Sequence, residues 1–286
     1  MGRRAAGAPK TESAPRVIVI ADGSLLSLNF ETLLVPTPEP HYWIEDATIA
    51  NASSIALLGA SSRTLALSRS QGMGQLKPVS TSATAPKLLL IGDPVYTGTE
   101  FPKLTQAKLE IERVESYFSP ASRLVMDGAS AKPSAYATTK PIHYDYIHFV
   151  AHGTATRVSP LDSSIVLSKD GDAYKLYARD IMAQPLRAEL VTISACYGAG
   201  NRAYSGEGLV GLSWAFLRAG AHNVIAALWE VNDLSTPQLM DNLYLNVKNG
   251  QDPATALRAA KLAMLHSENV FRKPFYWGAF QLYIGS

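Results

Sequence analysis

Short apolar runs, each closed by a turn, recur in the second half of the chain. The clearest are KLLLIGDP, YIHFVAHG, ELVTISAC and HNVIAALW, which begin at Lys87, Tyr146, Glu189 and His222. Runs of this length that are apolar throughout are typical of strands buried on both faces of a sheet. We therefore expect four such strands, covered on both sides.

Amphipathic helices are predicted between and after these strands. Residues 103–118 place apolar side chains on one helical face, and the pairs Thr236-Pro237 and Asp252-Pro253 are typical helix starts. Alternation of strands and helices implies a mainly parallel sheet. The predicted fold class is therefore α/β, with helices on both faces of the sheet.

The two ends of the chain have weaker patterns. The run RVIVIA from Arg16 and the segment 42–50 predict strands, and Ser54 can cap a short helix that ends at Leu67. Apolar side chains share one side of residues 276–284, which predicts a final strand at or near the edge of the sheet.

The domain division follows the composition. Residues 1–15 are rich in Ala, Gly, Pro and Arg, which indicates a disordered lead-in or the cut edge of a longer chain. Residues 68–86 are rich in Ser, Thr, Gly and Pro and predict a loop. We therefore expect residues 16–85 to form the N-terminal part of the domain and residues 86–286 its main part.

Composition narrows the class of protein. The 286 residues are 47% hydrophobic, enough for a large core, and the net charge of +2 comes without a dense basic block, so no nucleic-acid partner is expected. No apolar run reaches the length of a signal peptide or a membrane span, which predicts a cytoplasmic protein without a membrane partner. The single cysteine, Cys196, excludes an internal disulfide and a Cys-based zinc cluster.

Candidate chemistry lies at the ends of two of the predicted strands. One finishes at His152 and Gly153 and the next at Cys196, so an imidazole and a thiol are expected at the carboxyl edge of the sheet, where catalytic groups gather. A neighbouring His lets a thiolate form near neutral pH and then gives its proton to a leaving amine. The backbone N–H groups of Gly153 and Cys196 are predicted to form an oxyanion hole.

Plainer interpretations exist for each of these features. A lone cysteine at a strand end is commonly a small buried hydrophobe. His148 lies on the same side of its strand as His152, but no third ligand accompanies it, so neither a metal nor another cofactor is expected. The stretch GEGLVG, from Gly206, matches a dinucleotide-binding pattern, yet it begins ten residues after Cys196, and a tightly packed helix capped by Ser205 is the alternative.

Together, the motifs resemble the CHAT family, caspase-like peptidase domains that are related to separase and often attached to tetratricopeptide repeats. The resemblance runs through IADGSLLSLNFETLL, FVAHG, ISACYGAG, GEGLVGLSWAFLRAGAHNVIAALWEVND, ALRAAKLAML and PFYWGAFQLYIG, in this order. His152 precedes Cys196 by 44 residues, close to the spacing of about 50 in caspases. Ser194 stands where a caspase has Gln, so the chain fits a related branch.

This resemblance implies a caspase-type sheet and a thiol endopeptidase with His152 and Cys196 as its dyad. In separases a similar WxVxD stretch supplies an acid that receives an arginine, so Asp233, or otherwise Glu230, is expected to select a basic P1 residue. Ser194 is grouped with these substrate-binding residues. Alternatively, Asp233 only caps or approaches the following helix.

The resemblance also suggests the partners. It implies a protein substrate and a regulatory protein or repeat domain outside this chain, in a bacterial defence or signalling role. Two other classes remain open at this point: a proteolytically inactive CHAT-like scaffold that binds protein partners, and a nucleotide-binding α/β protein that uses GEGLVG.

Overall fold

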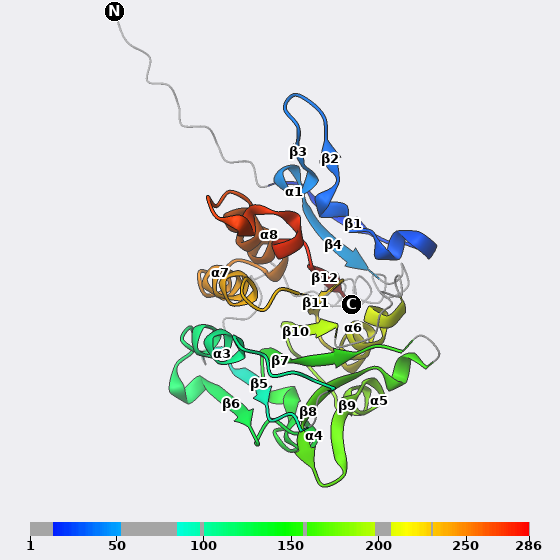
Figure 1. The fold of residues 1–286 in the computed structure, drawn as a ribbon, viewed down its shortest axis with the longest axis vertical. Coiled ribbons are helices and arrows are strands. Elements are labelled where there is room, and N and C mark those ends of the chain that lie inside the picture. The colour runs from blue at the N-terminus through cyan, green and yellow to red at the C-terminus, as the bar shows by residue number, and fades with distance from the viewer. Residues whose placement is uncertain are drawn as a thin grey trace, which may run out of the picture.

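The apolar runs predicted as strands form the middle of the sheet in the computed structural model (Figure 1). They are β5 (Leu88–Pro94), β7 (Tyr146–Thr154), β10 (Leu190–Tyr197) and β11 (Asn223–Ala227). Neighbours among them pair in parallel, and the residues from Leu88 to Ile91 are fully buried. The structure describes residues 14–52, 85–97, 100–156, 159–197, 207–229 and 231–285, with the backbone alone for residues 196–197 and 207–210.

Within the described residues the sheet has ten strands, ordered β1-β4-β12-β11-β10-β7-β5-β6, with β8 and β9 attached beside β7. The remaining strands are β1 (Arg16–Val19), β4 (Thr48–Ala52), β6 (Arg123–Gly128), β8 (Ser164–Asp170), β9 (Ala173–Tyr177) and β12 (Phe280–Ile284). Only β8, β9 and β12 introduce antiparallel pairings into this sheet. The mainly parallel α/β architecture expected from the sequence is confirmed.

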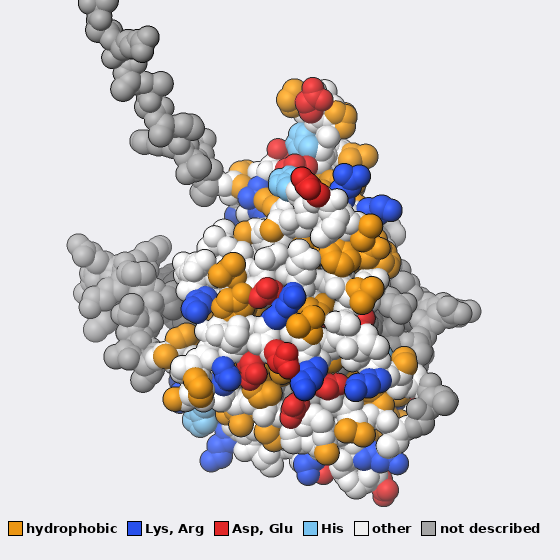
Figure 2. All heavy atoms as spheres, turned by 60° about the vertical axis from the view of Figure 1, so that its left-hand side comes forward, with side chains coloured by type: hydrophobic (Ala, Val, Ile, Leu, Met, Phe, Trp, Pro, Cys, Tyr) orange, Lys and Arg blue, Asp and Glu red, His pale blue; other side chains and the backbone are white. Residues whose placement is uncertain are grey.

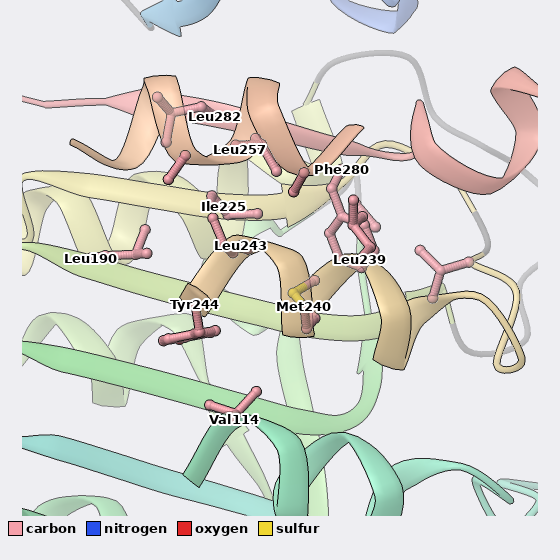
Figure 3. Packing of buried hydrophobic residues seen from close by; sticks show 14 of the residues in the cluster. Val114, Leu190, Ile225, Leu239, Met240, Leu243, Tyr244, Leu257, Phe280 and Leu282 are labelled. Carbon is pink, nitrogen blue, oxygen red and sulfur yellow. The ribbon is translucent and has the colours of Figure 1, made fainter. Parts of the chain in front are cut away.

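Helices cover both faces of the sheet and divide the core into two layers. One layer packs against α3 (Ala107–Glu115), α7 (Thr236–Lys248) and α8 (Pro253–Leu265). Figure 3 shows this layer, with Leu243 of α7 close to Ile225 of β11 and Leu239 close to Phe280 of β12. The other layer packs against α4 (Pro133–Thr138), α5 (Ala178–Met182) and α6 (Glu207–Ala219).

The surface above α3, α7 and α8 mixes charges of both signs (Figure 2). Arg113 of α3 lies 3.9 Å from Asp241 of α7, and the hydroxyl of Tyr117 donates to the same carboxylate at 2.5 Å. These contacts join two helices whose N-termini both lie near the carboxyl edge of the parallel strands.

The N-terminal segment adds β1 and β4 to one side of the sheet. The predicted strand 42–50 is divided between β3 (His41–Tyr42), α1 (Trp43–Asp46) and β4, and β3 pairs with β2 (Leu34–Val35) in a separate hairpin. The division has a local cause, because the Glu45 carboxylate accepts from the backbone N–H of Tyr42 and closes a helical turn.

A buried ion pair attaches this segment to the rest of the molecule. The Lys261 amine of α8, which is fully buried, contacts the buried Glu31 carboxylate, and the Gln281 amide donates to that carboxylate at 3.1 Å. Burial lowers the pKa of Lys261 and raises that of Glu31, with each charge opposing the shift of the other. Removing either partner would leave a buried charge uncompensated.

The C-terminal strand β12 follows the short helix α9 (Pro274–Trp277). It was predicted at or near the edge of the sheet, and it is not an edge strand, because it pairs with β11 on one side and with β4 on the other. The N-terminal strands β4 and β1 extend the sheet beyond it, and this long-range pairing has no signature in the C-terminal sequence.

Several sequence predictions concern residues outside the described ranges. The helix 54–67, nearly all of the loop 68–86 and most of the lead-in 1–15 belong to this group, so the division at residue 85 stays a prediction. Among the described helices, none combines the length and apolar character needed to cross a bilayer.

Candidate active site

The two predicted catalytic residues lie on neighbouring strands at the carboxyl edge of the sheet. β7 and β10 pair in parallel, and their register places Cys196 directly opposite His152. Most residues of both strands up to this point are buried, and they include the polar side chains of His148, Thr192 and Ser194. The register therefore brings the backbones of the two predicted dyad positions together.

His152 is held in one orientation by a backbone carbonyl. Its imidazole is buried, with 4% of the residue exposed, and Nε2 lies 2.7 Å from the carbonyl oxygen of Pro102. A carbonyl oxygen only accepts, so Nε2 carries the proton and a neutral ring has its lone pair on Nδ1. Nδ1 is buried and has no hydrogen-bond partner among the described residues.

Two aromatic rings surround the imidazole. The ring centroids of Tyr96 and Phe101 lie 5.0 and 5.7 Å from that of His152. The Tyr96 hydroxyl also accepts a hydrogen bond from the backbone N–H of His152, at 2.9 Å. Both rings come from the segment between β5 and α3, which therefore forms one wall around His152.

His148 belongs to a buried network on the same strand. Its Nε2 lies 2.9 Å from the Glu110 carboxylate of α3, and its Nδ1 lies 3.0 Å from the Tyr244 hydroxyl of α7, which is 3.3 Å from Thr192. Both ring nitrogens are thus engaged by side chains of the core. This favours the packed-histidine interpretation over a metal ligand, and no cluster of three metal-ligating side chains occurs within the described ranges.

The predicted oxyanion and substrate-binding residues have different surroundings. Gly153 is paired with Tyr197 of β10 on one side and with Ile165 of β8 on the other. Ser194 is buried, with 5% exposed, opposite Val150. Glu230 lies outside the described residues.

Asp233 is half-buried in the segment between β11 and α7. Its Oδ2 accepts from the Thr105 hydroxyl at 2.5 Å and from the backbone N–H of Gln106 at 3.1 Å. At the start of α7, Ser235 and Thr236 instead donate to the carbonyl oxygen of Asn232. Asp233 therefore does not cap the helix that follows it; it contacts the start of α3.

One glycine of the dinucleotide-like stretch has a packing role. A Cβ added at Gly211 in α6 would lie 2.8 Å from the carbonyl oxygen of Pro160 and from the Ser163 hydroxyl. Such a distance is too short for any larger side chain without displacement. The tightly packed helix therefore accounts for Gly211, while Gly206 and the predicted cap Ser205 lie outside the described residues.

Sequence reasoning did not find the residues that hold His152. Pro102 acts through its carbonyl, which every residue has, and Phe101 lies in an irregular segment without periodicity.

A second feature at this edge is Asp93, at the end of β5, which has a positive φ of 47°. Partial burial raises the pKa of Asp93. The signal for Asp93 in the sequence is its place in the turn Gly92-Asp93-Pro94 that ends LLLIGDP.

Comparison with known structures identifies the fold as that of the caspase-like cysteine peptidases. The Arg specific cysteine proteinase gingipain R matches with a TM-score of 0.50 and 11% identity, over 84% of this chain and 54% of that chain. A Saccharomyces cerevisiae separase-securin complex matches with a TM-score of 0.48 and 14% identity, over 84% of this chain and 14% of that chain. At these identities the likeness concerns the fold alone.

The chain belongs to the CHAT domain family, whose model matches residues 4–286. Tetratricopeptide repeat protein 28 is similar over 111 residues, with 34% identity in Mus musculus and 31% in Homo sapiens. These matches cover 39% of this chain but only 4% of each relative, so the chain corresponds to a small part of those proteins.

Proposed function

We propose that the chain is a cysteine endopeptidase that cleaves protein substrates with Cys196 and His152. The observation that carries this proposal is the register of β7 and β10, which places the two residues opposite each other. It is supported by the buried, unpartnered Nδ1 of His152 within the described residues, because a base needs a free lone pair. Family membership and the caspase-like fold agree with it.

The chemistry follows from the tautomer of His152. Nδ1 takes the proton of the Cys196 thiol, and the thiolate attacks the carbonyl carbon of the scissile peptide. The imidazolium then gives this proton to the leaving amine, the C–N bond breaks, and a thioester remains. Water, deprotonated by Nδ1, hydrolyses the thioester and restores the thiol. Throughout, the Pro102 carbonyl keeps Nε2–H in place and stabilises the transient positive charge.

The backbone N–H groups of Gly153 and Cys196 are proposed to stabilise the oxyanion of the tetrahedral intermediate. Substrate selection is assigned to Asp233, Glu230 and Ser194. The Asp233 carboxylate uses Oδ2 for Thr105 and Gln106, and no described residue donates to Oδ1, which leaves an acceptor for a basic P1 side chain. Activation by a partner protein or an attached repeat region, in the cytoplasm, completes the proposal.

The test uses acyloxymethyl ketone probes with a basic or an acidic P1 residue. Intact mass would show covalent labelling of the wild type and none of Cys196→Ala or His152→Ala. Labelling by the basic probe alone supports the Asp233 assignment, and labelling only by another probe keeps the peptidase but removes the basic preference. No labelling by any probe, with or without candidate partner proteins, would favour the inactive scaffold.

A further inference from the structure

One carboxylate joins two of the loops at the carboxyl edge of the sheet. Asp233 follows β11, whereas Thr105 and Gln106 precede α3, which itself follows β5. β10 and β7 lie between β11 and β5 in the sheet. The contact from Asp233 to Thr105 and Gln106 therefore connects the two flanks of the strands that carry Cys196 and His152.

The loop reached by Asp233 is the one that holds His152. Thr105 lies three residues after Pro102, whose carbonyl accepts from His152 Nε2 at 2.7 Å, and Phe101 packs against the imidazole. The N-cap residue of α3, Gln106, makes no side-chain capping bond of its own. Among the described residues, the Asp233 carboxylate is thus the side chain that accepts from Thr105 and Gln106 at this end of the loop.

We infer that Asp233 is a positioning residue for His152: through Thr105 and Gln106 it holds the loop that presents the Pro102 carbonyl, and so fixes the imidazole tautomer with Nδ1 free. The effect of this inference on catalysis rests on the proposed dyad. Its effect on the orientation and tautomer of His152 does not. A basic side chain bound to Oδ1 of Asp233 would contact the same anchor. Substrate selection and the orientation of the base would then depend on one carboxylate.

Two substitutions separate the positioning role from a purely charge-selecting one. Thr105→Val removes the hydroxyl contact and leaves the Asp233 charge, whereas Asp233→Asn removes the charge and keeps an oxygen that can accept from Thr105. Thr105→Ser keeps a hydroxyl at this position and should behave like the wild type. Thr255→Val is the matched control, because the Thr255 hydroxyl donates to Asp252 at 2.7 Å at the start of α8.

The first readout is the ¹⁵N NMR signature of the His152 ring, assigned among the six histidines by its loss in His152→Gln. Wild type, Thr105→Ser, Asp233→Asn and Thr255→Val should show the Nε2–H tautomer, and Thr105→Val a mixture of tautomers. A wild-type spectrum in Thr105→Val would overturn the inference. This readout requires no peptidase activity.

The second readout is the turnover of peptides with Arg or Gln at P1. Thr105→Val should lower kcat about tenfold on both peptides with little change in KM, because it displaces the base. Asp233→Asn should mainly raise KM for the Arg peptide. Equal kcat in Thr105→Val and wild type contradicts the inference, whereas an inactive wild type with the tautomer change intact contradicts the proposed function alone.

Discussion

The backbone N–H of His152 donates to the Tyr96 hydroxyl at 2.9 Å. The same hydroxyl lies 3.4 Å from the carbonyl oxygen of Val166 in β8. Tyr96→Phe removes this partner and leaves a buried donor unsatisfied. We expect the free energy of unfolding to fall by about 1–3 kcal/mol, measured by urea denaturation.

Tyr174→Phe provides a matched control for this measurement, since Tyr174 lies on β9, which does not pair with the strand of His152. A substitution without a structural role changes stability by only about 0.5 kcal/mol. Equal midpoints for Tyr96→Phe and Tyr174→Phe would show that the hydroxyl is not needed at His152.

At the residue scale, sequence and structure agree on the two candidate catalytic residues, each of which lies at the end of a strand. His152 and Cys196 were predicted to lie at one edge because each closes an apolar run, and the register of β7 and β10 confirms this placement. Their chemical roles stay predictions. The contacts of Pro102 and Thr105 arise from loop conformation and tertiary packing, which leave no pattern of hydrophobic positions.

At the element scale, helix starts carry the clearest local signals. Asp252 caps α8 as predicted, and its side chain accepts from the backbone N–H groups of Ala254 and Thr255. Partial burial opposes its negative charge, but the Thr255 and Ala254 hydrogen bonds and the Arg16 guanidinium outweigh burial and lower the pKa of Asp252. The start of α7 lies one residue earlier than predicted, with Ser235 as its N-cap.

Asp252→Ala should lower the free energy of unfolding by about 1 kcal/mol at neutral pH, as expected for the loss of an N-cap. Because the pKa of Asp252 is lowered in the folded state, its ionic contribution is complete above the ordinary pKa of aspartate and disappears as the pH falls through the lowered value. The difference between variant and wild type should therefore shrink from pH 7 to about pH 3. A constant difference in urea denaturation would contradict the charge assignment.

Elements that depend on distant partners were predicted less well. The segment 42–50 is apolar enough for one strand, but a helical turn at α1 divides it. The C-terminal segment 276–284 contains a strand, as predicted, yet one of its neighbours, β4, comes from the N-terminal segment and the other is β11. Local patterns indicate which segments form strands but not the order of strands in the sheet.

At the scale of the whole molecule, the N-terminal segment and the catalytic strands share one sheet. β4 pairs with β12, β12 pairs with β11, and the buried Glu31–Lys261 pair joins the segment to α8. We therefore expect a single cooperative unfolding transition. In a variant that retains only Trp43, in α1, and in one that retains only Trp214, in α6, the urea midpoint by fluorescence should equal the midpoint by far-UV circular dichroism of the same variant.

Far-UV circular dichroism of the same variants is the control, since it reports the whole sheet. A fluorescence transition at Trp43 that precedes the circular dichroism transition of the same variant would contradict the single unit. It would also support a boundary near residue 85 that separates two folding units.

The central claim is that His152 activates Cys196, and the single cysteine of the chain makes this directly measurable. The measurement is the rate of alkylation by iodoacetamide as a function of pH, followed by intact mass, in wild type and His152→Gln. At neutral pH we expect wild type to react at least about tenfold faster, with the two rates converging above about pH 10, where a thiolate forms without assistance. Identical pH profiles in the two proteins would contradict the dyad.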